Sequence, residues 1–237
     1  MEMEINGPKI VFTIPGIDMK VTETIILGWL VILLVTVFCL IVTSNLKKKP
    51  ETKRQMLAEL VVNFVNDTVK STMGDRFLYF SPYVAMILCY AGLGSLISML
   101  GLRAVTADFN TPLTLALMTF ILITFFKVKT NGVFGYFKSF TQPIAVITPI
   151  NILSEIATPV SMSVRLFGNV SAGTIITMLL YMGLTYLSNL IHLPVPALAV
   201  GIPAVLSAYF DLFSGCIQAY VFSMLTMVNV GSAAESD

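Results

Sequence analysis

Long apolar stretches separated by short polar segments dominate this sequence. The first stretch, Ile25–Thr43, has no charged residue, and its roughly 19 residues suffice for one crossing of a bilayer. Two further apolar stretches follow at Tyr79–Leu102 and Pro112–Phe126, and two longer ones at Ile150–Leu187 and Ala197–Val230. The pattern therefore predicts five membrane-crossing helices in a single membrane domain over residues 1–237.

A different pattern occurs in Lys53–Thr72, where apolar and polar residues recur with the period of a helix. The apolar positions are Met56, Leu57, Leu60, Val61, Phe64, Val65 and Val69. Charged and amide side chains occupy the remaining faces, a pattern that is typical of an amphipathic helix lying along the membrane surface. We therefore expect residues 53–72 to form a surface helix that does not cross the membrane.

The last two apolar stretches are too long for a straight crossing. A helix of about 34 residues is roughly 50 Å long, whereas the hydrocarbon core is about 30 Å thick. Such helices must tilt, kink or break. We expect residues 143–187 and 197–230 to form a tilted helical hairpin. The connection between them carries His192, the only histidine, which we expect at the surface.

The composition excludes a soluble protein. Only 11% of the 237 residues are charged and 56% are apolar, whereas a soluble domain devotes about 25% of its residues to charge. From Ser139 to Ala234 the only charged residues are Glu155, Arg165 and Asp211. The predicted fold class is therefore an all-α integral membrane protein. A formal net charge of +1 gives no indication of nucleic-acid binding.

The positions of the basic residues predict the orientation. Most basic residues follow the first or the third crossing. After the first crossing they are Lys47, Lys48, Lys49, Lys53, Arg54, Lys70 and Arg76, and after the third, in a predicted loop, they are Lys127, Lys129 and Lys138. The positive-inside rule places these segments in the cytoplasm. The N-terminal segment 1–24 is then outside, and five crossings put the C-terminus inside.

Cofactor and metal chemistry has no sequence support. Cys39, Cys89 and Cys216 lie in apolar runs without metal-ligand or redox spacing, and we expect them to act as small apolar side chains. No phosphate-binding loop or complete dinucleotide-binding fingerprint is present. We therefore expect no metal, no cofactor and no catalytic centre in this chain.

Polar residues follow one face of each of the last two predicted helices. On the first helix they are Ser154, Thr158, Ser161, Arg165 and Asn169, and on the second Ser207, Asp211, Ser214 and Gln218. A central arginine costs about 2.5–3.5 kcal/mol to insert, so it indicates a functional site. The alternatives are a structural ion pair of Arg165 with Glu155 or Asp211, and hydrogen bonds that only join the helices.

Small residues cluster near the same positions. They are Gly168, Ala172 and Gly173 on one helix and Ala204, Ala208 and Gly215 on the other. Such residues allow helices to approach closely, or they form a smooth face against which another protein can slide. The sequence leaves both interpretations open.

Three segments resemble the F-type ATP synthase subunit a family. They are Ser161–Asn169 (SMSVRLFGN) followed by Ala172-Gly173, Ile217–Phe222 (IQAYVF) with Leu225-Thr226, and Thr106–Asn110 (TADFN) before a crossing helix. The matches cover most of the chain from Thr106 to Asn229 in the order of the family. The resemblance identifies the chain as a bacterial-type member of this family.

The resemblance implies a stationary subunit of a rotary ion channel, packed against a ring of c subunits that each carry a mid-membrane carboxylate. Two offset half-channels would carry protons or sodium ions to and from these carboxylates, which couples ion flow to rotation and ATP synthesis. Arg165 would be the essential arginine opposite the carboxylate. The other implied partners are the peripheral-stalk b subunits, the rest of the synthase and membrane lipid, in a bacterial plasma membrane.

The resemblance also implies roles for other polar residues. Asn169 and Gln218 match family positions beside the arginine, and Ser161 lies one turn toward the cytoplasmic side. Many members carry glutamate where this chain has Thr174. We infer that the acid has moved to the facing helix, where Asp211 acts as the relay carboxylate.

Two alternatives remain open at this stage. Glu155 either serves the inner half-channel or extends only to the membrane interface. The chain as a whole could instead be a secondary transporter that binds an anionic solute at Arg165, or a structural membrane anchor. The absence of an internal repeat argues against the transporter, and neither alternative explains Asn169 and Gln218 at the family spacing.

Overall fold

A computed structural model describes residues 10–14, 19–44, 53–100, 102–141, 145–190, 205–206 and 209–235. The strands are β1 (Ile10–Ile14) and β2 (Met19–Thr22), and the α-helices are α1 (Glu23–Thr43), α2 (Lys53–Met73), α3 (Ser81–Leu96), α4 (Asn110–Ser139), α5 (Thr148–Leu190) and α7 (Gly215–Glu235). Short 3₁₀ helices are η1 (Asp75–Phe80), η2 (Ile97–Leu100), η3 (Val105–Ala107) and η4 (Ala145–Ile147), and η5 (Tyr209–Ser214) is a π-helix.

Five helical segments are long and apolar enough to cross a membrane. They are Glu23–Thr43, Asp75–Leu100, Asn110–Ser139, Thr148–Ser188 and Leu212–Ala234. The predicted fold class, an all-α integral membrane protein, is therefore confirmed. Helices suit this setting because every backbone hydrogen bond is made within the segment, where lipid offers no partner.

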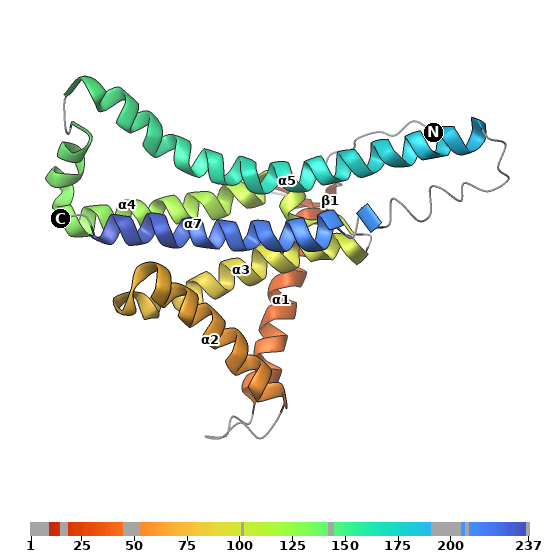
Figure 1. Cartoon of the computed structure of the whole chain (residues 1–237), viewed down its shortest axis with the longest axis horizontal. Helices are drawn as coiled ribbons and strands as arrows, with labels where there is room; N and C mark the ends of the chain where they lie inside the picture. Colours follow the sequence, from red (N-terminus) through yellow and green to blue (C-terminus); the bar gives the residue numbers. More distant parts are fainter. Residues whose placement is uncertain are drawn as a thin grey trace.

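The helices α3, α4 and α7 lie side by side, and the long α5 crosses over α4 and α7 (Figure 1). Two apolar clusters hold this arrangement together. One joins Ile87 of α3 and Leu115 of α4 to Leu166 of α5 and Phe222 of α7. In the other cluster Val69 of α2 and residues of η1 and α3 pack against the C-terminal half of α7. The helix α1 descends steeply from the bundle and contacts α3 (Figure 1).

The amphipathic helix α2 uses only part of its apolar face inside the molecule. Val65 and Val69 are buried against α7 and α3, whereas Met56 and Leu60 are more than 60% exposed. The end of α2 is tied to η1 by an ion pair of 2.9 Å between the exposed side chains of Lys70 and Asp75. The hydrogen bond and the charge of Asp75 raise the pKa of Lys70 above its usual value. The exposed apolar residues remain available for the membrane surface.

The prediction of a loop after the third crossing is wrong. The helix α4 continues from Asn110 to Ser139, so Lys127, Lys129 and Lys138 are helical. A kink interrupts it at Gly132, whose φ is 71° and ψ is 166°. Glycine reaches positive φ at little cost because it lacks a Cβ. The helical path is therefore broken at Gly132, which separates two helical segments within the predicted loop.

The fourth crossing helix is long and bent. The 43 residues of α5 correspond to about 65 Å of helix, twice the thickness of the hydrocarbon core. It bends near its middle (Figure 1), and Pro159 lies within it. Proline removes one backbone hydrogen bond and clashes with the preceding turn, which is a sufficient cause for a bend.

One part of the chain differs from the sequence-based expectation, and another is described only in part. The strands β1 and β2 pair in antiparallel orientation, which the sequence did not predict. The helix predicted from Ala197 is described only at residues 205–206 and from Tyr209 onward, where it begins as the π-helix η5. His192, Ala204, Ser207 and Ala208 lie outside the described residues.

Candidate functional site

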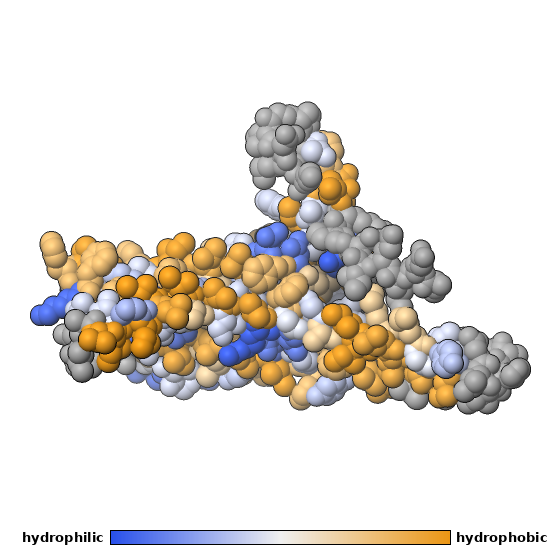
Figure 2. Space-filling model, turned by 90° about the horizontal axis from the view of Figure 1, so that it is seen from above, coloured by the Kyte–Doolittle hydropathy of each residue, from blue (hydrophilic) through white to orange (hydrophobic). Residues whose placement is uncertain are grey.

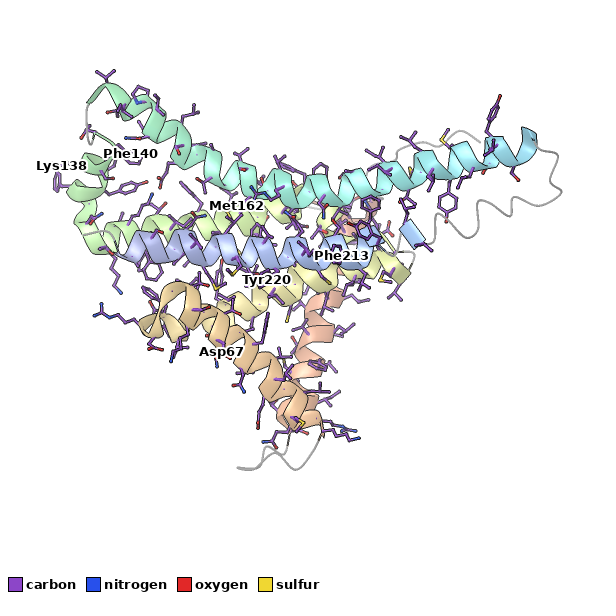
Figure 3. All side chains as sticks on the ribbon, in the orientation of Figure 1. Asp67, Lys138, Phe140, Met162, Phe213 and Tyr220 are labelled. Atoms are coloured by element: carbon purple, nitrogen blue, oxygen red, sulfur yellow. The ribbon has the colours of Figure 1, made fainter. Side chains whose placement is uncertain are left out.

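Arg165 faces away from the helix bundle. Met162 and Leu166 of the same helix are 4% and 0% exposed and pack against α3, α4 and α7. Figure 3 shows Met162 pointing from α5 toward the helices beneath it. Arg165 and Ser161 are four residues apart, so they share a face, and both are exposed. The outward side of α5 therefore carries the arginine.

Apolar side chains are exposed beside Arg165 and Ser161. Val160 and Val164 are 48% and 50% exposed. Seen from above, the molecule is largely hydrophobic, with small hydrophilic patches near its middle and at one end (Figure 2). Among the side chains that the structure describes, none forms a hydrogen bond or ion pair with Arg165. Arg165 therefore lies on the outward face of α5 without a described partner.

The two polar faces predicted from the sequence meet at Asn169 and Ser214. The Ser214 hydroxyl donates to Asn169 Oδ1 at 2.8 Å, and Asn169 Nδ2 donates to the Ser214 carbonyl oxygen at 3.2 Å. Ser214 is the last residue of the π-helix η5. Such widened turns leave backbone carbonyls without regular partners and occur often at functional sites. The pair therefore joins α5 to the start of α7, one turn from Arg165.

Gln218 follows Ser214 by one turn on α7. Its side chain is half-buried, and its Nε2 has no hydrogen-bond partner among the described residues although the atom itself is buried. A buried amide without a partner costs about 1–3 kcal/mol. Gln218 Nε2 therefore lacks a hydrogen-bond acceptor among the described residues.

The small residues divide into two groups. A Cβ on Gly173 would lie 3.2 Å from Cβ of Phe210, and one on Gly215 would lie 2.9 Å from Cβ of Ser95. Both glycines therefore serve close helix packing. A Cβ on Gly168, one turn from Arg165, would meet no atom within 4 Å among the described residues. Gly168 thus belongs to the open face.

This division predicts different effects of alanine substitutions on stability. Gly215→Ala is expected to destabilise the protein by about 1–3 kcal/mol, because the added methyl group overlaps the Ser95 side chain in a packed contact. Gly168→Ala is the matched control and is expected to leave stability within about 0.5 kcal/mol. Size-exclusion chromatography of the detergent-solubilised protein after heating measures both. Equal melting of the two variants would contradict the assignment.

Glu155 pairs with a lysine that the sequence analysis placed in a loop. Lys127 Nζ of α4 lies 2.8 Å and 2.7 Å from the two carboxylate oxygens of Glu155, and the two side chains are only 31% and 16% exposed. The alternative that Glu155 neutralises Arg165 is therefore wrong. The pair lines a cavity of about 330 Å³, together with Thr158 of α5 and Asn229 of α7. A polar cavity of this size can hold several waters.

The remaining predicted residues are less constrained. Thr174 is exposed, and its hydroxyl donates to the Val170 carbonyl oxygen at 2.9 Å. Asp211 lies in the π-helix η5, but its side chain is outside the described ones. The described residues contain no group of three histidine, cysteine or acidic side chains that could hold a metal ion.

Comparison with known proteins identifies the family of the chain. The family model described as ATP synthase A chain matches residues 25–231. The chain is 32% identical to "ATP synthase subunit a, sodium ion specific" of Propionigenium modestum, over 98% of this chain and 87% of the relative. It is 30% identical to ATP synthase subunit a of Staphylococcus carnosus, over 99% of this chain and 100% of the relative. The chain belongs to the ATP synthase subunit a family.

Membership in the ATP synthase subunit a family establishes the function in outline. The chain is a multi-pass membrane subunit of the stator of an F-type ATP synthase, and it takes part in ion transport coupled to ATP synthesis. A secondary transporter of an anionic solute is not favoured. The resemblance found in Ser161–Asn169 and Ile217–Phe222 is thereby confirmed.

The structure brings together some residues of this ATP synthase subunit and separates others. Asn169 and Ser214 are in contact, whereas Glu155 lies ten residues before Arg165 on α5 and pairs elsewhere. The sequence analysis missed Lys127 as a partner of Glu155. The available signal was its position one residue beyond the predicted end of a crossing helix, at which a basic side chain can reach a neighbouring helix.

Proposed function

We propose that α5 presents Arg165 to a ring of c subunits and that its guanidinium meets the mid-membrane carboxylate of each subunit in turn. The observation that carries the proposal is an exposed arginine with no described partner on an apolar face of a crossing helix. Facing lipid alone, such a group costs about 2.5–3.5 kcal/mol. An opposing carboxylate about 4 Å away would attract it by about 4 kcal/mol at an effective dielectric constant of 20.

This attraction would control the ion. It favours the ionised carboxylate, so a rotor site that reaches Arg165 releases its proton or sodium ion, and a loaded site cannot carry one past. Arginine suits the task because it remains charged when partly desolvated, whereas a desolvated lysine can lose its proton. Gly168 provides an open surface beside the arginine, over which the ring can move.

One half-channel is proposed to start at the cavity beside Glu155. The cavity is lined by charged and polar side chains, and Ser161 lies on α5 between Glu155 and Arg165. The ion pair with Lys127 holds the Glu155 side chain at the cavity wall. An ion could then move between the cavity and the rotor along the Ser161 face of α5.

The other half-channel is proposed on the opposite side of Arg165. Asn169 is held by Ser214, and the unpartnered Gln218 amide lies one turn further along α7. Thr174 and Asp211 would extend this path, with Asp211 as the relay carboxylate in place of the family glutamate. Because the two paths approach Arg165 from opposite ends of α5, an ion must travel with the ring to pass between them.

The orientation is proposed from the charge distribution. The basic residues at the end of α2, in η1 and in the last part of α4 lie at the end of the bundle where α7 also ends: Lys70, Arg76, Lys127, Lys129 and Lys138. The positive-inside rule assigns this end to the cytoplasm of a bacterial cell. The start of α1 then lies outside, and the peripheral-stalk b subunits are the proposed partners beside the c ring.

The coupling ion is proposed to be a proton or a sodium ion. The Propionigenium modestum relative is named as sodium ion specific, and hydroxyl and carboxylate groups such as those of Thr174 and Asp211 suit either ion. Selectivity would reside mainly at the rotor carboxylate. Both gradients therefore have to be tested.

Disulfide cross-linking in assembled membranes tests the rotor-facing surface. Cys39, Cys89 and Cys216 are first replaced by serine, and a cysteine is placed beside the c-subunit carboxylate. Ser161→Cys and Gly168→Cys are expected to form disulfides with the c subunit on oxidation, because a bridge requires Cα atoms about 4.4–6.8 Å apart. Ser163→Cys is the matched control, since Ser163 is 0% exposed on the inner face of α5. Cross-linking from position 163 but not from 161 or 168 would refute the proposed face.

A further inference from the structure

One of the three segments that resemble the subunit a family has no role in the proposed ion path. It is the 106–110 segment, Thr106–Asn110, which runs from η3 into α4. The ring of Phe109 in this segment meets the ring of Phe167 of α5 edge to face. The ring centroids are 5.5 Å apart and the ring planes are at 83°, which is a favourable arrangement for an aromatic pair. The 106–110 segment therefore contacts α5 at the second residue after Arg165.

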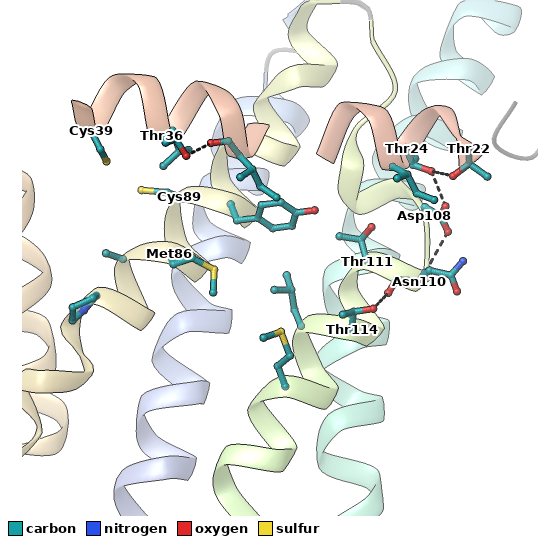
Figure 4. Close-up of a pocket in the computed structure, with 18 residues that line it drawn as sticks. Thr22, Thr24, Thr36, Cys39, Met86, Cys89, Asp108, Asn110, Thr111 and Thr114 are labelled. Carbon is teal, nitrogen blue, oxygen red and sulfur yellow. Dashed lines mark hydrogen bonds between the residues drawn. The ribbon is translucent and has the colours of Figure 1, made fainter. Parts of the chain in front are cut away.

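The 106–110 segment is itself tied to two other helices. Thr24 at the start of α1 is 2% exposed and donates a hydrogen bond of 2.8 Å to Asp108 Oδ2. The Asn110 backbone N–H donates one of 3.2 Å to Asp108 Oδ1, so both carboxylate oxygens are held (Figure 4). The hydroxyl groups of Thr106 and Ser95 of α3 share a buried hydrogen bond of 3.2 Å. The backbone that carries the aromatic ring is therefore fixed to α1 and α3.

The part of α5 around Arg165 depends on tertiary contacts for its orientation. Pro159 lies within α5, six residues before the arginine, and a proline removes one backbone hydrogen bond of a helix. Leu166 holds one side of this part in the apolar core. At about 100° per residue, Phe167 lies about 200° round the helix from Arg165. A contact at Phe167 therefore opposes rotation of α5 about its own axis, which a contact at Leu166 alone does not.

Packing sets this rotation because the hydrophobic effect cannot. Lipid chains are as apolar as a phenyl ring, so crossing helices are held together by close packing and by polar contacts. The polar contact next to Arg165 is the hydrogen-bonded pair of Asn169 and Ser214, which belongs to the proposed ion path. Phe109 has no polar side-chain atom and acts on α5 by packing alone.

We propose that Phe109 is a positioning residue for Arg165. By packing against Phe167 it fixes the rotation of α5, and with it the distance between the guanidinium and the carboxylate of each c subunit. The 106–110 segment relays the positions of α1 and α3 to this point. The inference rests on the proposed role of Arg165 and adds a residue that acts through α5 and not on the ion.

The first measurement is the rate of ATP synthesis per assembled complex in membrane vesicles, normalised to the recovered c ring. Phe109→Leu keeps an apolar side chain but removes the ring. It is expected to lower the rate about fivefold, because a displacement of about 1 Å can cost a hundredfold and a smaller one costs less. Phe109→Tyr keeps the ring and should stay within about twofold of wild type. Phe134→Leu is the matched control, since it removes a 92% exposed ring from the same helix and should leave the rate unchanged.

The second measurement shows whether the position of α5 changes. Ser161→Cys and Val164→Cys lie about 60° apart round the outward side of α5. Each is introduced into the cysteine-free chain and oxidised with a cysteine beside the c-subunit carboxylate. Phe109→Leu is expected to change the ratio of the two disulfide yields about threefold, because a bridge forms only over a narrow range of Cα distances. A loss of stability alone would lower both yields together and leave their ratio unchanged.

The outcomes separate this inference from the proposed function. A wild-type rate in Phe109→Leu would overturn the inference, and so would a lower rate with an unchanged yield ratio, since α5 would not have turned. Both results leave the rotor-facing surface intact. Absence of a disulfide from Ser161→Cys while Phe109 is still present would refute the rotor-facing surface itself, and this inference with it.

Discussion

Replacing Arg165 with alanine is expected to abolish ATP synthesis driven by an ion gradient. The substitution removes an attraction of about 4 kcal/mol between the guanidinium and the rotor carboxylate, which corresponds to a loss of roughly a thousandfold. Rotor sites would then pass the stator while still loaded, and ion flow would no longer require rotation. The measurement is ATP synthesis in membrane vesicles, with a proton gradient and separately with a sodium gradient.

Two comparisons make this result specific to the arginine. Arg165→Lys retains a positive charge but lacks the planar guanidinium and can lose its proton when desolvated, so it is expected to restore little of the activity. Val164→Ala changes the adjacent exposed residue and should leave the rate near that of the wild type. Recovery of the c ring with the subunit controls for assembly. An Arg165→Ala complex that assembles and still synthesises ATP at half the normal rate would exclude the proposed role.

Breaking the Lys127–Glu155 pair is expected to have the second largest effect. Lys127→Ala leaves a carboxylate that is 16% exposed without its cation. Removing one partner of a buried pair costs about 3–5 kcal/mol, and an exposed pair contributes about 0–1 kcal/mol. For this partly buried pair we expect a loss of about 1–3 kcal/mol in stability. ATP synthesis should fall about tenfold, because the cavity wall loses the cation that holds Glu155 in place. The readouts are the level of the chain in membranes and the rate of ATP synthesis per complex.

The charge-reversed pair provides the control for this second prediction. A chain with both Lys127→Glu and Glu155→Lys restores an ion pair across the same helices, so its membrane level should exceed that of either single variant. Its transport should remain low if Glu155 itself serves the half-channel. Lys129→Ala removes an exposed lysine from the same helix and should change neither quantity. Normal transport in the charge-reversed chain would show that the pair has only a structural role.

The sequence predicted the crossing helices well where local chemistry decides them. Ile25–Thr43 is apolar without interruption, and the structure places α1 at Glu23–Thr43. The prediction of a loop after Phe126 was wrong because lysines and an Asn-Gly pair are typical of both a connection and a helix end. In the structure α4 continues and only Gly132 departs from helical geometry. The N-terminal strand pair was missed because its short strands carry little periodicity.

Some residues of the candidate site could likewise be predicted from the sequence, and others could not. Arg165, Asn169 and Gln218 could be found from the sequence because they interrupt apolar helices at helical spacing and match a family motif. Lys127 could not, because it contacts Glu155 from a position 28 residues away on another helix.

By itself, the sequence determined that the chain crosses a membrane repeatedly, that it belongs to the ATP synthase subunit a family, and which few polar residues lie within the crossings. These properties depend on the length of apolar runs and on local motifs, both of which can be counted along the chain. Only the tertiary structure decided which of those polar groups are satisfied. Glu155 is paired and Asn169 is hydrogen-bonded, whereas Arg165 faces outward without a described partner. Pairing depends on how helices distant in sequence pack together, and that packing is set by contacts such as those of Leu166 and Phe222 across the core.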